Sequence, residues 1–551
     1  NASREVYEPK ETYRGYNANG IAEQQSRRSS SYSNENVLTY IKKIGQHSLN
    51  VMVGSSLLYE ENKTGSMTAR DFISDVYGYN NLDAGAQWDK PNTGRSKSTL
   101  LSGFGRINYV LMDKYLFTVT GRADGSSKFG ANNKWAFFPS FAAAWRINQE
   151  KFMKNIDWIS NLKIRGSWGV TGNQNIPAYS SPEKMNTYTY PIGGVTSVGI
   201  GAGNMPNPDL KWETTAITDI GIDLGVFNNR INFTADYYYK KTTDLLWNIS
   251  VPLTTGFGTV LKNIGSLQNK GLELSLSADV LTGPFKWNTM LNWSTNKNKV
   301  LEIPGYIPTQ QGTISGHLKV NGSWLEPGLP VGVWNLLKTN GVMRTEKEWQ
   351  DAARVADSNF DKIGDMSFVD KNGDGKISFG EDRQIVGDPN PDFIFGWTNN
   401  FSYKNFDLSV YINGSVGNDI YNVLRAETNI VSAWGNQRAE VKDRWTVNNP
   451  NGKYPRAHVL VNQNLLQSDY LIEDGSFLRI QNVTLGYTFP KVSFLRSLRI
   501  YATAQNLLPI TGYSGYNPEV NSQGQSNLQL GVDYNAYPTA RSFILGVNIG
   551  F

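Results

Sequence analysis

The sequence predicts an all-β protein, a transmembrane antiparallel β-barrel, and three observations support this prediction. Hydrophobic and polar residues alternate in several runs longer than ten residues, whereas strands of soluble proteins usually have about five or six. No stretch of the sequence approaches the roughly 18 to 20 consecutive apolar residues that a membrane-spanning helix needs, and the mean hydropathy is -0.42, so a helical membrane protein is not expected. Short turns largely alternate with long polar stretches, which is the pattern of outer-membrane barrels with their long loops facing outward.

The alternation gives each strand one apolar and one polar face. Residues 219–240 show it on both sides of a short turn at Asn228 and Asn229. In the run 162–168 the polar face carries Lys163 and Arg165. Laying out all such runs predicts about sixteen strands, near 3–13, 37–43, 48–59, 99–110, 115–124, 137–147, 162–172, 213–226, 231–246, 266–281, 285–298, 393–403, 406–420, 476–489, 498–508 and 540–551.

The connections between these strands are of two kinds. Short turns are expected at 112–114, 228–229, 282–284 and 404–405, with slightly longer ones at 148–161 and 490–497. Long, polar, Gly- and Asn-rich stretches occupy 60–98, 173–212, 299–392, 421–475 and 509–539. No fixed repeat period is present, which argues against a propeller or solenoid.

Aromatic residues recur near strand ends, where an interfacial girdle would place them, and the last strand alternates up to Phe551. The alternative is the aromatic core of a β-sandwich. Many of the strands are too long for most sandwiches, which favours the barrel.

Composition excludes several classes of function. The 551 residues include no Cys, which rules out disulfide scaffolds, Cys-ligated metals and thiol catalysis. The net charge is +5 and no block of like charges forms a basic arm, so no nucleic acid partner is expected. His47, His317 and His458 lack partners at metal-ligand or triad spacing, and no G-x-S-x-G motif occurs. We therefore expect no enzymatic activity, although paired carboxylates brought together by the fold are not visible in a sequence.

One motif predicts a metal site. The segment DKNGDGKISFGE, residues 370–381, satisfies the twelve-residue calcium-loop pattern at every position. The expected ligands, as side-chain or backbone oxygens, are Asp370, Asn372, Asp374, Lys376, Ser378 and Glu381. The flanking residues do not predict the paired helices of an EF-hand, so we expect a structural Ca²⁺ that pins a long loop. The alternatives are an Asp/Asn/Gly turn without metal and a regulatory Ca²⁺ switch, which is the least favoured because no second site is apparent.

Two loop features have more than one interpretation. Trp434 lies beside Asn436 and Gln437, and Tyr188 and Tyr190 alternate with threonines. These aromatic residues could bind sugar rings or peptides, or pack loops together. The string GIGAG at 199–203 has Asn204 where a dinucleotide site needs its third glycine, so a flexible loop is expected.

Several strings together resemble the SusC/RagA-type TonB-dependent transporters. They include RADGSSKFGANNKWAFFPSFAAAWRINQEKFM (122–153), LKIRGSWGVTGNQNI (162–176), GDPNPDFIFGWTNNFSYKNFDLSV (387–410) and DGSFLRIQNVTLGYTFP (474–490), and the resemblance runs from about residue 35 to Phe551.

The resemblance implies a 22-stranded barrel in the bacterial outer membrane with extracellular long loops, filled by an N-terminal plug. It implies active nutrient import, of glycan oligosaccharides or peptides, driven by TonB through the plug. It also implies a SusD-like surface lipoprotein as a lid, and paired transporter–lid units. No plug or TonB-contacting segment is apparent, and the predicted strands are too few. We therefore expect residues 1–551 to be the C-terminal barrel portion of a chain nearly twice as long.

On the same resemblance, the lid is expected to dock on the long loops, of which 299–392 is the largest. Two other classes remain open. A passive 16-stranded porin would be complete in itself, since its even strand count could close. A non-transporting barrel, such as an adhesin, would need a narrow or filled lumen, which the sequence does not show.

Overall fold

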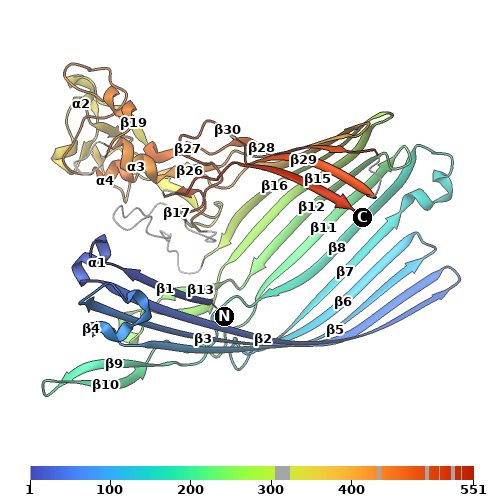
Figure 1. Ribbon diagram of the computed structural model, residues 1–551, viewed down its shortest axis with the longest axis horizontal. Helices are drawn as coiled ribbons and strands as arrows, with labels where there is room; N and C mark the ends of the chain where they lie inside the picture. Colours follow the sequence, from blue (N-terminus) through green and yellow to red (C-terminus); the bar gives the residue numbers. More distant parts are fainter. Residues whose placement is uncertain are drawn as a thin grey trace. The chain divides into compact units, whose positions relative to one another are not determined.

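The computed structural model describes residues 2–303, 323–430, 436–490, 495–507, 509–522, 528–534 and 536–551 (Figure 1). The chain divides into two compact units. Unit 1 comprises Asn1–Ala144, Ser167–Ile217 and Thr242–Gly265, and unit 2 comprises Trp145–Gly166, Thr218–Lys241 and Ser266–Phe551. In the described ranges, no helix combines the length and apolar character needed to cross a membrane.

Eighteen of the described strands belong to one antiparallel sheet, and sixteen of them overlap the sixteen predicted strands. The other two are short, namely β4 (Gly85–Trp88) and β30 (Pro509–Thr511). The sheet strands of unit 1 are β1 (Ala2–Glu8), β2 (Ile21–Ile44), β3 (His47–Phe72), β4, β5 (Asn92–Leu111) and β6 (Tyr115–Ser126). Those of unit 2 are β15 (Ser266–Thr282), β16 (Phe285–Glu302), β24 (Phe393–Tyr403), β25 (Phe406–Val416), β28 (Phe477–Thr488), β29 (Ser497–Gln505), β30 and β32 (Ser542–Gly550). Four strands have residues in both units, namely β7 (Trp135–Arg146), β8 (Ile159–Asn173), β11 (Glu213–Val226) and β12 (Ile231–Thr243).

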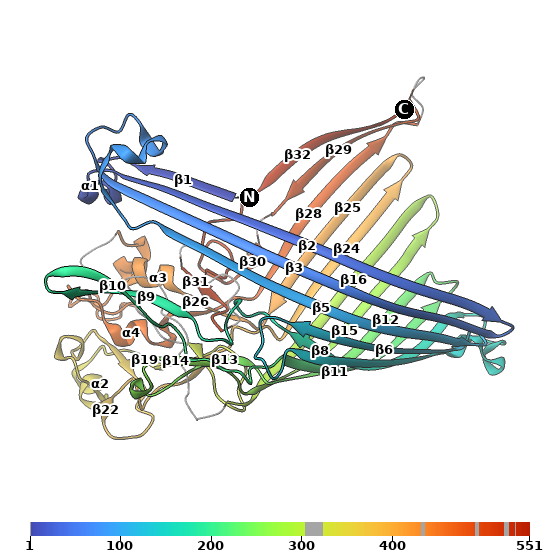
Figure 2. The same cartoon turned by 90° about the horizontal axis from the view of Figure 1, so that it is seen from below.

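The longest strands extend well beyond their predicted ends. β2 has 24 residues and β3 has 26 (Figure 2). The two strands pair from Ile21 with Arg70 at one end to Ile44 with His47 at the other. The predicted strands covered only 37–43 and 48–59. The added length lies in the Ser-, Asn- and Glu-rich part, where apolar alternation is lost while the backbone pairing continues. Side-chain periodicity therefore underestimates a strand that is polar on both faces.

The short turns form where the sequence predicts them. Met112 and Asp113 have φ of 56° each between β5 and β6. Asn228 and Asn229 have φ of 59° each between β11 and β12, and residues of this kind tolerate the left-handed region best after glycine.

In unit 2, aromatic side chains gather on one face of the sheet near its short turns. Phe285 packs against Phe401 and Tyr403, with ring centroids 6.1 and 6.4 Å apart. Tyr487 packs against Phe406, at 4.8 Å, and against Phe489, at 5.0 Å. The sequence placed an aromatic girdle at strand ends, and these clusters have that form.

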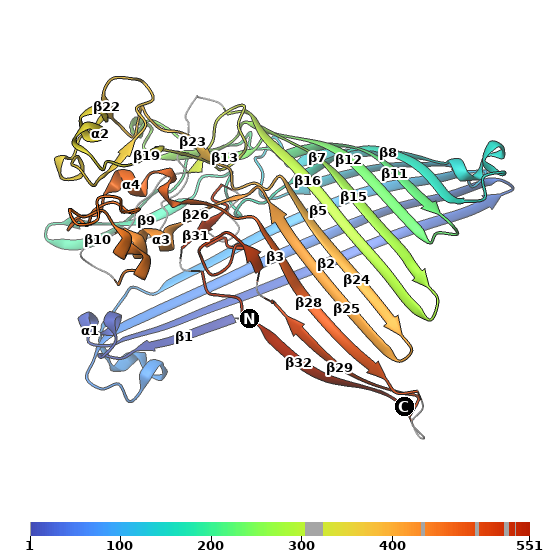
Figure 3. The same ribbon diagram turned by 90° about the horizontal axis from the view of Figure 1, so that it is seen from above.

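The long connections of unit 2 are not simply polar loops. They fold into a module with its own hydrophobic core, called here the loop module (Figure 3). Its fully buried side chains include Trp334, Leu336, Leu337, Leu466 and Leu471. Its strands are β17 (Ser323–Trp324), β18 (Val333–Leu336), β19 (Thr339–Val342), β20 (Arg354–Val355), β21 (Met366–Phe368), β22 (Lys376–Ile377), β23 (Gln384–Gly387), β26 (Asp419–Asn422), β27 (Ile472–Asp474) and β31 (Val532–Asp533). Its helices are α2 (Glu346–Asp351), η6 (Ser358–Phe360), α3 (Val423–Asn429), η7 (Ala439–Asp443), α4 (Gln463–Leu466) and η8 (Asp469–Leu471).

The loops of unit 1 contain smaller elements. A second core cluster joins Phe129, Phe138, Ile176, Leu210 and Trp212. The remaining elements are α1 (Tyr13–Ala18), η1 (Gly78–Asn80), η2 (Leu82–Ala84), β9 (Met185–Ile192), β10 (Val195–Ala202), β13 (Leu246–Ser250), η5 (Leu253–Thr255) and β14 (Thr259–Asn263) in unit 1, and η3 (Ile147–Gln149) and η4 (Lys151–Met153) in unit 2.

Candidate functional site

A cavity of about 830 Å³ lies within unit 2, beside the polar faces of its strands. Its walls come from β12, β15, β16, β24, β25 and the first residue of β28, together with residues near 389–391, 418–420, 518–521 and 530–531. Carboxylates, amides and hydroxyls share these walls with a few aromatic rings. The described lining includes three carboxylates and no Lys, Arg or His, so it suits a polar ligand and disfavours an anionic one.

Two lining residues each have one side-chain oxygen that is buried in the wall. Among the described residues, Oδ1 of Asp236 and Oδ1 of Asn413 have no hydrogen-bond partner, and each exposes less than 1 Å². A ligand in the cavity would therefore meet the exposed polar groups of the lining, such as Glu273 and Asn292, and these favour a ligand that carries hydrogen-bond donors.

One wall of this region is held by ion pairs around Arg165. Its guanidinium contacts Asp236 at 2.6 Å, Asp219 at 3.4 Å and Asp223 at 3.5 Å. Lys163 contacts Asp223 at 3.0 Å. The sequence showed two cations on a polar face, and the structure adds three carboxylates from β11 and β12 that pair with them and outnumber them by one.

Another wall is held by Arg479, whose side chain is buried. Its guanidinium pairs with Glu519 and donates to Asn517 Oδ1 at 2.6 Å. Asn413 donates from Nδ2 to Glu519 at 3.3 Å. These bonds fix the segment around Glu519 against the strand that carries Asn413, so this wall has a defined geometry.

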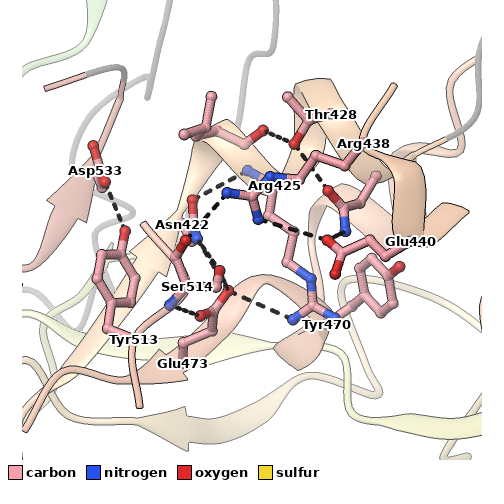
Figure 4. Close-up of polar contacts among 12 residues, drawn as sticks. Asn422, Arg425, Thr428, Arg438, Glu440, Tyr470, Glu473, Tyr513, Ser514 and Asp533 are labelled. Atoms are coloured by element: carbon pink, nitrogen blue, oxygen red, sulfur yellow. Dashed lines mark hydrogen bonds and ion pairs between the residues drawn. The ribbon is translucent and has the colours of Figure 1, made fainter. Parts of the chain in front are cut away.

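A polar cluster joins four segments of unit 2 behind that wall (Figure 4). Glu473 accepts from Asn422 at 3.0 Å and from the Ser514 hydroxyl at 2.9 Å, and it lies 3.7 Å from Arg425. Tyr513 donates to Asp533 at 2.7 Å, and burial raises the pKa of Tyr513.

The same cluster extends to Glu440 and Tyr470. Asn429 donates to Glu440 at 2.5 Å, and this hydrogen bond lowers the pKa of the Glu440 carboxyl. Arg425 lies over the Tyr470 ring, and burial raises the pKa of Tyr470 to about 12. Nearly every polar group of the cluster has a protein partner, which indicates a structural role in the loop module.

The calcium-like segment forms a tight loop in the structure. Asp370 accepts from the N–H groups of Gly373 and Gly375 at 2.6 and 2.7 Å. Asn372 accepts from Asp374 N–H at 3.0 Å, and Asp374 accepts from Lys376 N–H at 2.8 Å. The side chains predicted for the first half of a calcium loop thus organise its backbone.

The second half differs from expectation at one residue. Asp382, which lies one position beyond the pattern, is 0% exposed and accepts from Lys371 N–H at 3.0 Å and Ser378 N–H at 2.7 Å. Glu381 is exposed. The calcium-loop pattern ends at Glu381 and so does not include Asp382, although the two acidic residues are adjacent in the sequence.

In the described part of the chain, no three His, Asp or Glu side chains gather as a metal centre. The remaining predicted ligands, Asn372, Ser378 and the Lys376 carbonyl, are of other kinds. Calcium binding stays a prediction.

The other residues singled out in the sequence are dispersed. His458 contacts the buried Asp365 at 2.6 Å, together with Arg456, in the loop module. His47 contacts Tyr109 at 2.7 Å on the main sheet. His317 and Trp434 lie outside the described residues. The expectation of a flexible loop for GIGAG is wrong, because residues 199–202 belong to β10.

Comparison with known proteins decides the family. The family model described as "TonB dependent receptor-like, beta-barrel" matches residues 3–375 of this chain. The chain belongs to the TonB-dependent receptor family. Its barrels lie in the outer membrane, so the fold class predicted from alternation and turn lengths is confirmed.

Two relatives within the TonB-dependent receptor family span nearly the whole chain. TonB-dependent receptor P3 of Formosa agariphila is 36% identical over 556 residues, which cover 99% of this chain and 55% of that protein. TonB-dependent receptor SusC of Bacteroides thetaiotaomicron is 33% identical over 546 residues, covering 93% of this chain and 49% of that protein. The chain thus spans about half the length of these relatives, and the resemblance to SusC-type proteins is confirmed.

A solved structure supports the fold. A chain in the structure of the RagAB peptide transporter superposes with a TM-score of 0.82, at 23% identity, covering 97% of this chain and 56% of that chain. At this identity the likeness concerns the fold. It shows that this chain shares its overall fold with that chain over nearly its whole length.

Proposed function

We propose that this chain is the barrel portion of a SusC-like transporter that imports nutrients across the outer membrane, driven by TonB. The observation that carries the proposal is membership of the TonB-dependent receptor family, with SusC among the relatives. The substrates proposed are glycan oligosaccharides or peptides, and a SusD-like surface lipoprotein is proposed to cover the barrel mouth.

The cavity of unit 2 supports a polar substrate of this kind. Glu273 and Asn292 present exposed side-chain acceptors, and Trp293 and Tyr411 line the same cavity. Oligosaccharides supply many hydroxyl donors, and peptides supply N–H donors. Either would satisfy acceptors that a simple hydrocarbon ligand would leave unpaired.

The test begins with the native polypeptide that carries this C-terminus, isolated from its outer membrane. A mass near twice 61.5 kDa, with a co-purifying lipoprotein, is expected for a transporter with a plug and a lid. The mass of the intact complex also tests whether transporter–lid units pair. A conductance trace separates the classes, because a plugged transporter is closed and a porin conducts. A stable 61.5 kDa species that conducts alone would refute the proposal.

We also propose that the loop 370–381 binds a structural Ca²⁺ through Asp370, Asn372, Asp374, Lys376, Ser378 and Glu381. The loop geometry supports this, since Asp370 and Asp374 already fold back on their own backbone. Oxygen atoms of these kinds are the ligands that Ca²⁺ prefers. Calcium would then stabilise this part of the loop module, on which the lid is proposed to dock.

The double substitution Asp374→Ala with Glu381→Ala tests both steps. We expect faster proteolysis of residues 360–390 and weaker lipoprotein co-purification, and the same effects from EGTA in the unmodified protein. Asp351→Ala changes an exposed carboxylate outside the pattern and serves as the matched control. Unchanged proteolysis and co-purification in the double variant and after EGTA would disprove the calcium-dependent docking.

A further inference from the structure

The hairpin β9–β10 of unit 1 is a small exposed sheet with no charged side chain. Residues 185–204 include no Asp, Glu, Lys or Arg. The two strands pair from Val195 with Ile192 to Ala202 with Met185, and they form a two-stranded sheet of their own (Figures 1 and 2). The turn between them is made by Gly193 and Gly194, with φ of 59° and 82°.

Three side chains of β9 lie over glycines, two of them in β10 and one, Gly203, just beyond its end. A Cβ atom added at Gly199 would come within 1.9 Å of the Tyr190 hydroxyl. One added at Gly201 would lie 3.1 Å from the Tyr188 ring, and one at Gly203 would lie 2.5 Å from the Asn186 amide carbon. The glycines of GIGAG therefore leave the space that these side chains occupy.

The two tyrosine rings are held down on the sheet with their outer sides open. Tyr188 donates from its hydroxyl to the Ala202 carbonyl at 2.9 Å, which fixes that ring. Tyr188 and Tyr190 are 43% and 45% exposed, in keeping with one covered and one open side. They are two residues apart on one strand, so they share a face of the hairpin and stand roughly 6.8 Å apart.

We propose that Tyr188 and Tyr190 form a surface platform that binds a neutral saccharide chain. The C–H face of a pyranose ring packs well on a flat aromatic ring, and two rings in a row accept successive sugar units. Asn186 and Ser197 lie on the same face and can hydrogen-bond sugar hydroxyls. Because the hairpin has no charge, an uncharged ligand meets no unpaired ion and an acidic one gains no salt bridge.

A peptide is the less favoured ligand on this surface. Peptides bind exposed strands by backbone pairing and gain specificity from pockets for alternate side chains. The tyrosines instead lie against glycines, which offer no side chains to form the walls of such a pocket. The platform goes beyond the proposed import function, because binding at the hairpin requires neither TonB nor the cavity of unit 2.

The test measures binding of labelled polysaccharides to the purified full-length transporter in detergent. The probes are soluble starch, dextran and a neutral mannan, with alginate as an acidic polysaccharide and a tryptic peptide mixture for comparison. Tyr188→Ala with Tyr190→Ala should weaken binding of the preferred neutral polysaccharide about tenfold or more. Tyr188→Phe with Tyr190→Phe should retain binding, because the rings remain.

Two further variants separate the platform from a general effect on the hairpin. Gly199→Ala keeps both rings but displaces Tyr190, so it should weaken binding by about threefold. Thr187→Ala with Thr189→Ala alters the opposite face and should leave binding unchanged. Protease sensitivity at Gly193 and Gly194, compared among all variants, reports whether the hairpin itself is intact.

Each outcome decides the matter. If the hairpin stays intact, weaker binding by the Tyr188→Ala with Tyr190→Ala variant and by the Gly199→Ala variant supports the platform, even if the protein does not import nutrients. Absence of binding to any neutral polysaccharide, or equal binding by the double alanine variant, overturns it. Binding of peptides that depends on the tyrosines also overturns it and identifies a protein-docking surface instead.

Discussion

The hydrophobic core of the loop module can be tested at Leu466. This side chain is 0% exposed and packs within the cluster that contains Trp334 and Leu337. Leu466→Ala removes three carbon atoms, and their lost burial costs about 2.4 kcal/mol. The cavity left behind raises the cost toward the range of about 2.7–5 kcal/mol for fully buried leucines. We expect the free energy of unfolding of the module to fall by about 3 kcal/mol.

Pulse proteolysis of the full-length protein in increasing urea measures this change, with cleavage scored between residues 323 and 475. At about 1–3 kcal/mol per molar urea, the midpoint should fall by about 1–3 M. Leu460→Ala is the matched control, because Leu460 is 58% exposed and should shift the midpoint little. Equal midpoints for the two variants would show that the module has no cooperative core around Leu466.

Three more predictions concern charged groups. Asp365 is 1% exposed and binds Arg456 at 2.8 Å. Asp365→Ala should therefore lower the urea midpoint of the loop module by the equivalent of about 2–3 kcal/mol, whereas Asp351→Ala should leave it unchanged. Equal midpoints for the two variants would contradict a stabilising role of the Asp365–Arg456 pair. Burial raises the pKa of Asp419, so its contribution to stability is present below the carboxyl's unfolded pKa and is lost as the pH rises through the folded pKa. Asp419→Asn keeps an acceptor for Asp388 N–H and has no carboxyl group that can ionise. The urea midpoint of this variant should therefore exceed that of the unmodified protein by more at pH 7 than at pH 4. An equal difference in midpoint at the two pH values would refute this. Arg165→Met removes the guanidinium that contacts Asp219, Asp223 and Asp236, and leaves Lys163 beside Asp223 and Lys240 near Asp219. The protein should therefore unfold at a lower temperature, and the effect should be smaller in 1 M salt. An unchanged melting temperature at low salt would contradict this.

The sequence by itself located sixteen of the eighteen described strands of the large sheet, although it underestimated the length of β2 and β3. Period-two alternation is a local property, because neighbouring side chains of a strand point to opposite faces whatever lies elsewhere in the chain. For that reason the bounds of β11 and β24 agree with the predicted 213–226 and 393–403. The calcium-like motif and its turn-forming side chains are also local, and the structure forms the tight loop that they predict.

Only the tertiary structure decided how distant segments meet. Leu337 and Leu466 share one core although 129 positions separate them, and the short strands between them carry too few residues for a periodic signal. Arg165 pairs with carboxylates from two other strands. The glycines of GIGAG leave room for the side chains of Asn186, Tyr188 and Tyr190, which only the pairing of the two strands brings next to them. Such contacts depend on which backbones lie side by side. The sequence offered Tyr188 and Tyr190 as ligand-binding candidates, but residue order alone could not reveal the buried module, the ion cluster or the packing of these tyrosines over glycines.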